Sequence, residues 1–297
     1  MNNIKDTFTI QDFENLSGIK AHTIRIWEKR YALFNPDRIN RNVRIYSILD
    51  LQKILNLSVL YNHGIKISKL SCLSDRELAD KAKEIALERI SGNYQINTLI
   101  VSMYTFDASA FEEVYLEEIT NNSFENLFVS IYLPLLEHIG VLWQTDSIKP
   151  AHEHFISNLI YQKISLQIAQ LPKLTNNTNK EAHVLFLPDG EIHEIGLYFF
   201  NYYLLSKGFR TIYLGASVPF EDLSFVNSQF QNITWVTSFI IDKSVEEKQL
   251  FLENTIKLIE NTKNKFKIVS SSWSGFFSEN KAQGVVCYDS FRNLIKI

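Results

Sequence analysis

The sequence predicts a multidomain α and α/β protein whose last part is a doubly wound parallel sheet. Three observations predict this organisation. Helix-start signals and a basic, proline-containing loop fill about the first seventy residues. Apolar residues then recur at helical spacing to about Leu171, and strand-like and helix-like segments alternate from Ala182 onward. A chain of 297 residues has room for two or three such domains.

Charge is divided unevenly along the chain. The net charge is −3, yet residues 1–70 carry 11 Lys and Arg against six Asp and Glu, whereas the remainder carries 19 against 27. A basic module joined to an acidic body is typical of a protein of which one end meets a polyanion such as nucleic acid. A chance cluster of surface lysines gives the same count, so charge alone leaves both interpretations open.

The composition also limits the cellular setting. The apolar stretches are shorter than the roughly 18–20 residues that span a bilayer, and the N-terminal residues do not resemble a secretory signal. The two cysteines, Cys72 and Cys287, lie far apart without metal-ligand spacing. We therefore expect a soluble, cytoplasmic protein with no membrane partner.

The N-terminal module is expected to begin with two helices joined by a tight turn. Thr9 and Asp12 form a capping pattern that begins the first helix, and Gly18 supplies the turn. The second helix is expected from about Ala21 to Lys29. The arginines that lie off its inward face are Arg25 and Arg30. This is the arrangement of a helix-turn-helix that enters a DNA major groove.

A basic loop from Asn35 to Tyr46 follows and predicts a β-ribbon wing. Its arginines are Arg38, Arg41 and Arg44. Arginines on such a ribbon suit contact with DNA phosphates. Ser47 and Asp50 then form a capping pair that begins another helix, which Gly64 ends.

This ordered set of motifs has a parallel in a known family. The run Ile24–Tyr31, with Pro36, Arg44–Ser47, Asp50-Leu51 and Gly64-Ile65, resembles the MerR-family DNA-binding domain over about residues 7–73. The resemblance implies a winged helix-turn-helix that binds double-stranded promoter DNA. It also implies which residues contact the DNA backbone: Arg25, Arg44 and Tyr46, with Arg30, Arg38 and Arg41 as helpers. A solvated surface charge is the alternative for each arginine taken alone.

The middle of the chain is expected to be a four-helix-type bundle. Ser74 and Glu77 form a capping box, and apolar segments separated by polar breaks follow as far as Leu171. A polar linker comes next. We place the domains at 1–73 for the winged helix-turn-helix, 74–172 for the helical bundle, 173–181 for the linker and 182–297 for the α/β domain.

The α/β domain is expected to bind its ligand at the carboxyl ends of the strands, as such sheets do. The loop after the first strand contains Glu191, His193 and Gly196. The His193 imidazole can serve as an axial metal ligand, and Glu191 can accept from its other ring nitrogen and so raise its donor strength. Gly196 lets a bulky ligand approach the start of the next helix. An ordinary surface histidine is the alternative for His193 taken alone.

A second motif lies in the helical middle. Trp143 is followed after nine residues by Glu153-His154, and this pair of motifs resembles the cobalamin-binding part of CarH/LitR-type light-responsive regulators. Those are MerR proteins with a helical cap above a cobalamin-binding, Rossmann-like domain. The resemblance implies that His193 is the lower axial ligand of cobalt, with Glu191 behind it. It implies that Trp143, Glu153 and His154 lie near the upper, adenosyl face. For Trp143 a bundle-core aromatic is the alternative.

One departure from that family concerns the nucleotide tail of the cofactor. Cobalamin domains of this kind usually carry Gly-Gly after the fourth strand, where the matching residues here are Ser270 and Ser271. The family's serine site after the third strand corresponds to Ser238, with the branched Ile240 close behind. Insertion of the tail is therefore left open.

These inferences describe a DNA-binding transcriptional regulator, of the repressor kind, controlled by a bound cofactor. By the resemblance, adenosylcobalamin would act as a light sensor that governs self-association, as a dimer or tetramer, and DNA binding. Two alternatives stay open. Either the sensor domain has diverged and binds another ligand or none, or the chain is a corrinoid methyl-carrier. A methyl-carrier has no use for a winged helix, so we expect no enzyme.

Overall fold

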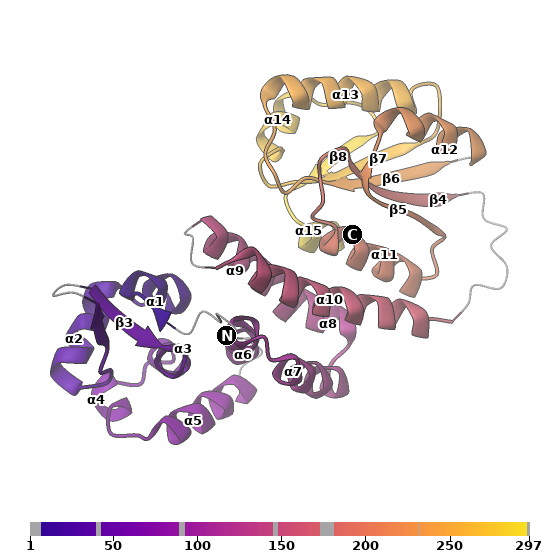
Figure 1. Ribbon diagram of the computed structural model, residues 1–297. Coiled ribbons are helices and arrows are strands. Elements are labelled where there is room, and N and C mark those ends of the chain that lie inside the picture. The colour runs from indigo at the N-terminus through magenta and orange to yellow at the C-terminus, as the bar shows by residue number, and fades with distance from the viewer. Residues whose placement is uncertain are drawn as a thin grey trace. The chain divides into compact units, whose positions relative to one another are not determined.

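The computed structural model describes residues 7–39, 43–88, 93–144, 148–172, 181–230 and 232–295 (Figure 1). The chain divides into two compact units, Met1–Leu159 and Ile160–Ile297. In the described ranges, no helix combines the length and the apolar character that crossing a membrane requires.

The first unit begins with a winged helix-turn-helix. Helix α1 (Ile10–Ser17) begins at a capping box between Thr9 and Asp12 and ends at Gly18, whose φ of 71° suits glycine. A second capping box, between Ser47 and Asp50, begins α3. The remaining elements are α2 (Ala21–Tyr31), α3 (Ile48–Asn62), α4 (Ile67–Leu70), β1 (Thr7–Phe8), β2 (Asp37–Ile39) and β3 (Val43–Ser47). The three strands form an antiparallel sheet in the order β1-β3-β2. The predicted capping pairs, turn and β-ribbon are confirmed.

A helical middle follows, as predicted. Ser74 and Glu77 form the expected capping box before α5, with reciprocal hydrogen bonds at 2.8 and 3.3 Å. The helices are α5 (Asp75–Glu88), α6 (Asn93–Thr105), α7 (Ala108–Asn121), α8 (Phe124–Leu127), the π-helical turn η1 (Phe128–Tyr132), α9 (Leu133–Gln144) and α10 (Pro150–Gln170). Residues 173–180 of the expected linker lie outside the described part of the chain.

A five-stranded parallel sheet organises the second unit. Its strands are β4 (Ala182–Pro188), β5 (Thr211–Val218), β6 (Ile233–Ser238), β7 (Lys265–Val269) and β8 (Val285–Tyr288), in the order β5-β4-β6-β7-β8. The chain runs outward in both directions from β4 and β6, so the topological switch point lies between these two strands. The doubly wound sheet predicted from the sequence is confirmed.

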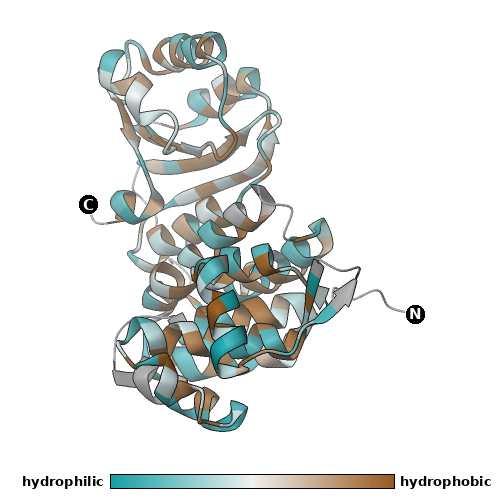
Figure 2. Cartoon of the chain, turned by 90° about the vertical axis from the view of Figure 1, so that its left-hand side faces the viewer, coloured by the Kyte–Doolittle hydropathy of each residue, from teal (hydrophilic) through white to brown (hydrophobic). Residues whose placement is uncertain are grey.

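Helices cover both faces of this sheet (Figure 1). One face carries α11 (Ile195–Ser206) and α15 (Phe291–Ile295). The other carries η2 (Phe220–Asp222), α12 (Leu223–Gln229), α13 (Val245–Ile259) and α14 (Ser274–Glu279). Because both faces are covered, the central strands β4 and β6 are buried along almost their whole length, and Figure 2 shows many apolar residues in the sheet. The sequence does not predict the short helices α14 and α15.

Candidate functional site

The loop between β4 and α11 leaves the carboxyl end of β4, at the switch point. Gly190 turns the chain with a φ of 77°, and Glu191 then points back into the protein. The Glu191 side chain is 1% exposed. A carboxylate this deeply buried requires hydrogen bonds to remain charged.

Hydrogen bonds surround the Glu191 carboxylate. Its Oε1 accepts from the backbone N–H of Ile192 at 3.0 Å and of His193 at 3.1 Å. Its Oε2 accepts from the backbone N–H of Ile240 at 2.9 Å and of Ile241 at 3.3 Å. Burial alone would raise the pKa of this carboxyl, but the bonds from the His193 side chain and from the backbone amides outweigh it and lower the pKa to about 2. Glu191 therefore ties the loop after β4 to the loop after β6 across the switch point.

The same carboxylate orients His193. The Nδ1 atom of His193 lies 2.5 Å from Glu191 Oε1, and the histidine side chain is 46% exposed. Because Nδ1 is engaged, a metal would be ligated through Nε2, with Glu191 raising the donor strength of the ring. Large apolar side chains stand exposed around this point: Ile192, Ile240 and Ile241. An exposed apolar rim of this kind is typical of a surface that receives a ligand.

Gly196 lies in the first turn of α11 and is covered by another part of the chain. A Cβ atom added there would lie 2.7 Å from Cδ2 of the Phe291 ring, which belongs to α15. Phe291 is buried, 6% exposed, in a cluster with Leu197 and Phe200. The space that the sequence assigned to a ligand beside Gly196 is thus filled by Phe291.

The three serines of the expected tail site differ in their surroundings. Ser238 ends β6 with its Oγ buried and without a hydrogen-bond partner among the described residues. Ser270 is buried, and its Oγ lies 3.2 Å from that of Ser272. Ser271 is exposed, and its carbonyl accepts from Ser274 Oγ at 3.0 Å.

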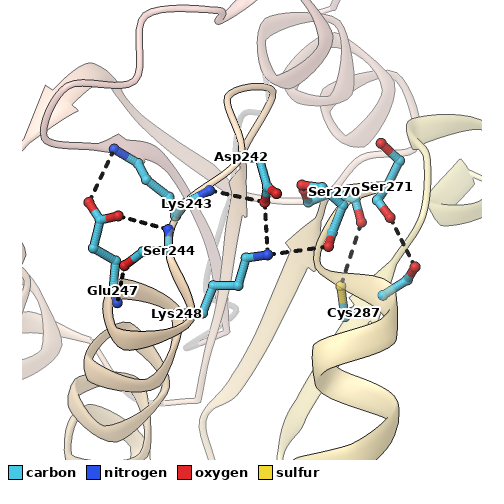
Figure 3. A network of polar contacts seen from close by, with 10 residues as sticks. Asp242, Lys243, Ser244, Glu247, Lys248, Ser270, Ser271 and Cys287 are labelled. Atoms are coloured by element: carbon cyan, nitrogen blue, oxygen red, sulfur yellow. Dashed lines mark hydrogen bonds and ion pairs between the residues drawn. The ribbon is translucent and has the colours of Figure 1, made fainter.

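Lys248 of α13 joins the loops after β6 and β7 (Figure 3). Its Nζ lies 2.8 Å from Asp242 Oδ1 and donates to the Ser272 carbonyl at 3.4 Å. Behind it, the Trp273 ring stacks on Phe239 with centroids 4.0 Å apart. These contacts fix the two loops against each other on the α13 and α14 face of the sheet.

The other residues of the expected cofactor site lie in helices α9 and α10, in the first unit. Glu153 and His154 lie in the first turn of α10, with Glu153 Oε2 3.0 Å from His154 Nδ1 and Glu153 Oε1 accepting from Ser157. The His154 side chain is largely exposed. Trp143 lies in α9, and its side chain falls outside the described residues.

On the DNA-binding module, a carboxylate of α2 joins two wing residues. The Nε of Arg44 donates to both Glu28 oxygens, at 2.9 and 3.1 Å, and the Tyr46 hydroxyl donates to Glu28 Oε2 at 3.0 Å. The Tyr46 ring is fully buried and stacks on Phe13 with centroids 4.3 Å apart. The expectation that Tyr46 contacts the DNA backbone is corrected on this point, because the side chain lies in the core and positions Glu28.

The expected arginines occupy two surfaces. Arg25 and Arg30 are exposed on α2, off the face that buries Ile24 and Trp27, as predicted. Arg44 is partly exposed on β3. Arg38 lies in β2 with its side chain outside the described residues, and Arg41 lies outside them altogether.

Sequence reasoning missed three features of these sites. Glu28 follows Trp27 directly, and nothing else in the sequence indicates that it pairs with Arg44 and Tyr46. The amides of Ile240 and Ile241 act through the backbone, which leaves no trace in residue type. Phe291 stands in a five-residue helix too short for a periodic pattern.

Two family models match the chain. The model described as "MerR HTH family regulatory protein" matches residues 8–76, and the model described as "B12 binding domain" matches residues 95–166. The first match covers the winged helix-turn-helix. The second covers helices α6 to α10 as far as residue 166, including Trp143, Glu153 and His154.

Known proteins of similar sequence and fold agree with these matches. The HTH-type transcriptional repressor CarH of Myxococcus xanthus is 24% identical over 223 residues, covering 73% of this chain and 73% of its own. CarA, another HTH-type transcriptional repressor of that organism, is 24% identical over 262 residues, covering 84% and 83%. The monomethylamine corrinoid protein of Methanosarcina barkeri shares the fold, with a TM-score of 0.54 and 14% identity over 67% of this chain and 93% of its own.

The curated relatives are transcriptional repressors and not enzymes. Their sequences align with both the DNA-binding module and the regions that follow it. The chain therefore joins a MerR-type helix-turn-helix domain to a B12-binding domain and is homologous to the CarH and CarA transcriptional repressors.

Proposed function

We propose that this chain is a cytoplasmic transcriptional repressor that binds promoter DNA through its winged helix-turn-helix and holds cobalamin, in the adenosyl form, against His193. The domain boundaries 1–73, 74–172 and 182–297 belong to this proposal. The observation that carries it is the Glu191–His193 pair at the switch point of the sheet, the place where ligands bind in such folds.

The residues at this point fit a corrinoid in their chemistry. His193 offers one imidazole, which suits a cobalt ion whose equatorial ligands arrive with the macrocycle. Glu191 stays ionised and holds the ring by its Nδ1. The exposed side chains of Ile192, Ile240 and Ile241 present an apolar rim to the flat macrocycle. The buried, unpartnered Oγ of Ser238 supplies a hydrogen bond for a polar group that reaches it.

Three residues of α9 and α10 belong to the proposal as well. Trp143, Glu153 and His154 are proposed to contact the upper group, Trp143 by packing and the other two by hydrogen bonds. When bound, the adenosyl form supplies a cobalt–carbon bond that light cleaves, and this is the source of the proposed light response. The chain's own part is to change its self-association, as a dimer or tetramer, when the upper group is lost.

On the DNA side, Arg25 of α2 and Arg44 of the wing are proposed to contact the DNA backbone, with Arg30, Arg38 and Arg41 as helpers. Glu28 fixes the direction of Arg44 through two hydrogen bonds. Self-association fits this mode of binding, because a symmetric multimer reads inverted half-sites about one helical turn apart.

A second candidate is a regulator whose sensor binds another ligand or none. Two observations favour it. The first is that Phe291 fills the space beside Gly196. Ser270, where cobalamin domains of this kind usually carry glycine, points the same way.

The absorption spectrum of the full chain loaded with adenosylcobalamin in the dark separates the two candidates. We expect the spectrum of a histidine-ligated corrinoid, its loss in His193→Ala, and its retention in His22→Ala, which removes an exposed histidine of α2. Illumination should then change the spectrum and the oligomer size seen by gel filtration. If the parent takes up no cobalamin at micromolar concentration, the sensor has diverged. A complex that His193→Ala leaves intact would place the cofactor elsewhere.

A further inference from the structure

We propose that Phe291 is a specificity-determining residue of the corrinoid site: it occupies the route that the lower appendage of the ligand needs, and so selects among corrinoids. This inference rests on the proposed function. It concerns which corrinoids bind easily, whereas the proposed function concerns whether they bind at all.

The first step of the argument follows from the position of His193. A histidine that ligates cobalt from below takes the place of the cofactor's own lower base. That base, with its nucleotide linker, must then lie on the same side of the macrocycle as the loop carrying His193. It therefore has to pass along one face of the sheet, either beside α13 and α14 or beside α11 and α15.

The α13 and α14 face is closed by a tightly connected group. Trp273 is 1% exposed and stacks on Phe239 with centroids 4.0 Å apart. Lys248 holds the two loops that carry these rings through Asp242 at 2.8 Å and the Ser272 carbonyl at 3.4 Å (Figure 3). Opening this face would break the Lys248–Asp242 ion pair, in which only the lysine is buried, and a buried aromatic stack together.

The α11 and α15 face is closed by Phe291. Its ring lies on the bare Cα of Gly196, where a Cβ would come within 2.7 Å of Cδ2. Helix α15, which carries Phe291, has five residues. Two hydrogen bonds hold it: the Tyr203 hydroxyl donates to the Ile295 carbonyl at 3.2 Å, and the Asn293 side chain donates to Asp289 Oδ1 at 2.6 Å. Displacing one ring and one short helix is a smaller change than opening the opposite face.

Selection follows from this difference. Cobinamide, a corrinoid without the nucleotide, reaches His193 while Phe291 stays in place. Cobalamin binds only to the form in which Phe291 has left Gly196. If the closed form outnumbers the open form about ten to one, the apparent affinity for cobalamin is reduced about tenfold, and that for cobinamide is unchanged.

The first test uses the cofactor-free chain and reads thermal unfolding. Gly196 has no positive φ, so alanine at this helical position should by itself raise the melting temperature. With Phe291 present, Gly196→Ala should instead lower it, because the new methyl meets the ring. In a Phe291→Ala background, Gly196→Ala should raise it. Equal effects of Gly196→Ala in both backgrounds would show that the two residues do not meet in solution.

The second test titrates hydroxocobalamin and cobinamide into the full chain. Phe291→Ala should bind cobalamin about tenfold more tightly than the parent and leave cobinamide binding unchanged. Phe277→Ala is the matched control, since it removes a ring of similar burial, 8% against 6% exposed, from the opposite face; it should change neither.

The outcomes separate the two proposals. Unchanged or weakened cobalamin binding by Phe291→Ala, in a chain that binds cobalamin, overturns the role of Phe291 and leaves the proposed function standing. Tighter binding of cobalamin by Phe291→Ala than by the parent, with cobinamide binding unchanged, supports it. If neither the parent nor any variant binds either corrinoid, the proposed cofactor is overturned, and selection by Phe291 is overturned with it.

Discussion

Glu191 Oε1 lies 2.5 Å from the Nδ1 atom of His193, and the other oxygen of the same carboxylate accepts from the amides of Ile240 and Ile241. One buried charge therefore sets the direction of the imidazole and the distance between two loops.

Glu191→Gln should weaken cobalamin binding by about 10–100-fold, because an amide is a weaker acceptor for the imidazole N–H and leaves the ring less firmly oriented. The measurement is a titration followed by absorbance, with Glu253→Gln, a change at an exposed glutamate of α13, as the control. We expect the far-ultraviolet circular dichroism of both variants to match the parent. Equal affinity of Glu191→Gln and the parent would mean that His193 needs no partner.

The stability of the cofactor-free chain should depend on Glu191 in acid. Its carboxyl has a pKa of about 2 in the folded protein against an ordinary 4.5, so the unfolded state binds the proton first. The stabilisation is fully present above pH 4.5 and is lost as the pH falls from 4.5 through about 2. This shift corresponds to about 3 kcal/mol. Urea unfolding should show that the free energy of unfolding falls less between pH 6 and pH 3 in Glu191→Gln than in the parent.

Arg44→Ala should weaken binding to all DNA sequences alike, because the proposed contact is to phosphate. The slope of log K against log salt should fall by about one unit. Arg76→Ala, which removes an exposed arginine of α5 outside the wing, is the control and should leave the slope unchanged. A salt dependence of Arg44→Ala equal to that of the parent would rule out this role for the wing.

Tyr46→Phe tests the corrected role of that residue. The buried hydroxyl donates to the charged Glu28 carboxylate at 3.0 Å, so its removal should destabilise the DNA-binding module by about 1.5–3 kcal/mol. Thermal unfolding should show this loss, whereas DNA affinity measured well below the melting temperature should stay near that of the parent. The reverse pattern, full stability with lost affinity, would return Tyr46 to the DNA backbone.

Trp143→Ala tests the proposed upper face. The variant should bind hydroxocobalamin as the parent does and lose the preference for the adenosyl form. A loss of about 3–5 kcal/mol in the free energy of unfolding, typical of deleting a core aromatic, would assign Trp143 to the bundle core instead. Comparison of the two corrinoids on the same preparation distinguishes these results.

The parts of the fold that the sequence predicts well depend on short-range interactions. The capping pairs Thr9–Asp12 and Ser47–Asp50 act within one helical turn, so their spacing is visible in the sequence. The strands of the parallel sheet are equally plain, since burial on both faces leaves runs such as Val184–Leu187.

The parts that it does not predict depend on residues far apart in the chain. Glu191 meets the Ile240 amide 49 positions away, and no residue type records a backbone donor. Gly196 indicates that another group approaches the backbone closely, but the sequence does not identify that group. In the structure it is the Phe291 ring. Tyr46 follows three wing arginines, which suggests a surface residue, while its neighbours in space are Phe13 and Phe34.

The Glu28 carboxylate has a consequence for how the protein searches DNA. It places a negative charge within 3.1 Å of the arginine that is proposed to hold the backbone, and so reduces the attraction of the wing for any phosphate chain. Attraction that does not depend on sequence is what retains a regulator on the many sites that are not its own. We therefore expect a wing with this carboxylate to leave non-specific DNA sooner, so that the residence time at the operator depends more on the contacts proposed for α2.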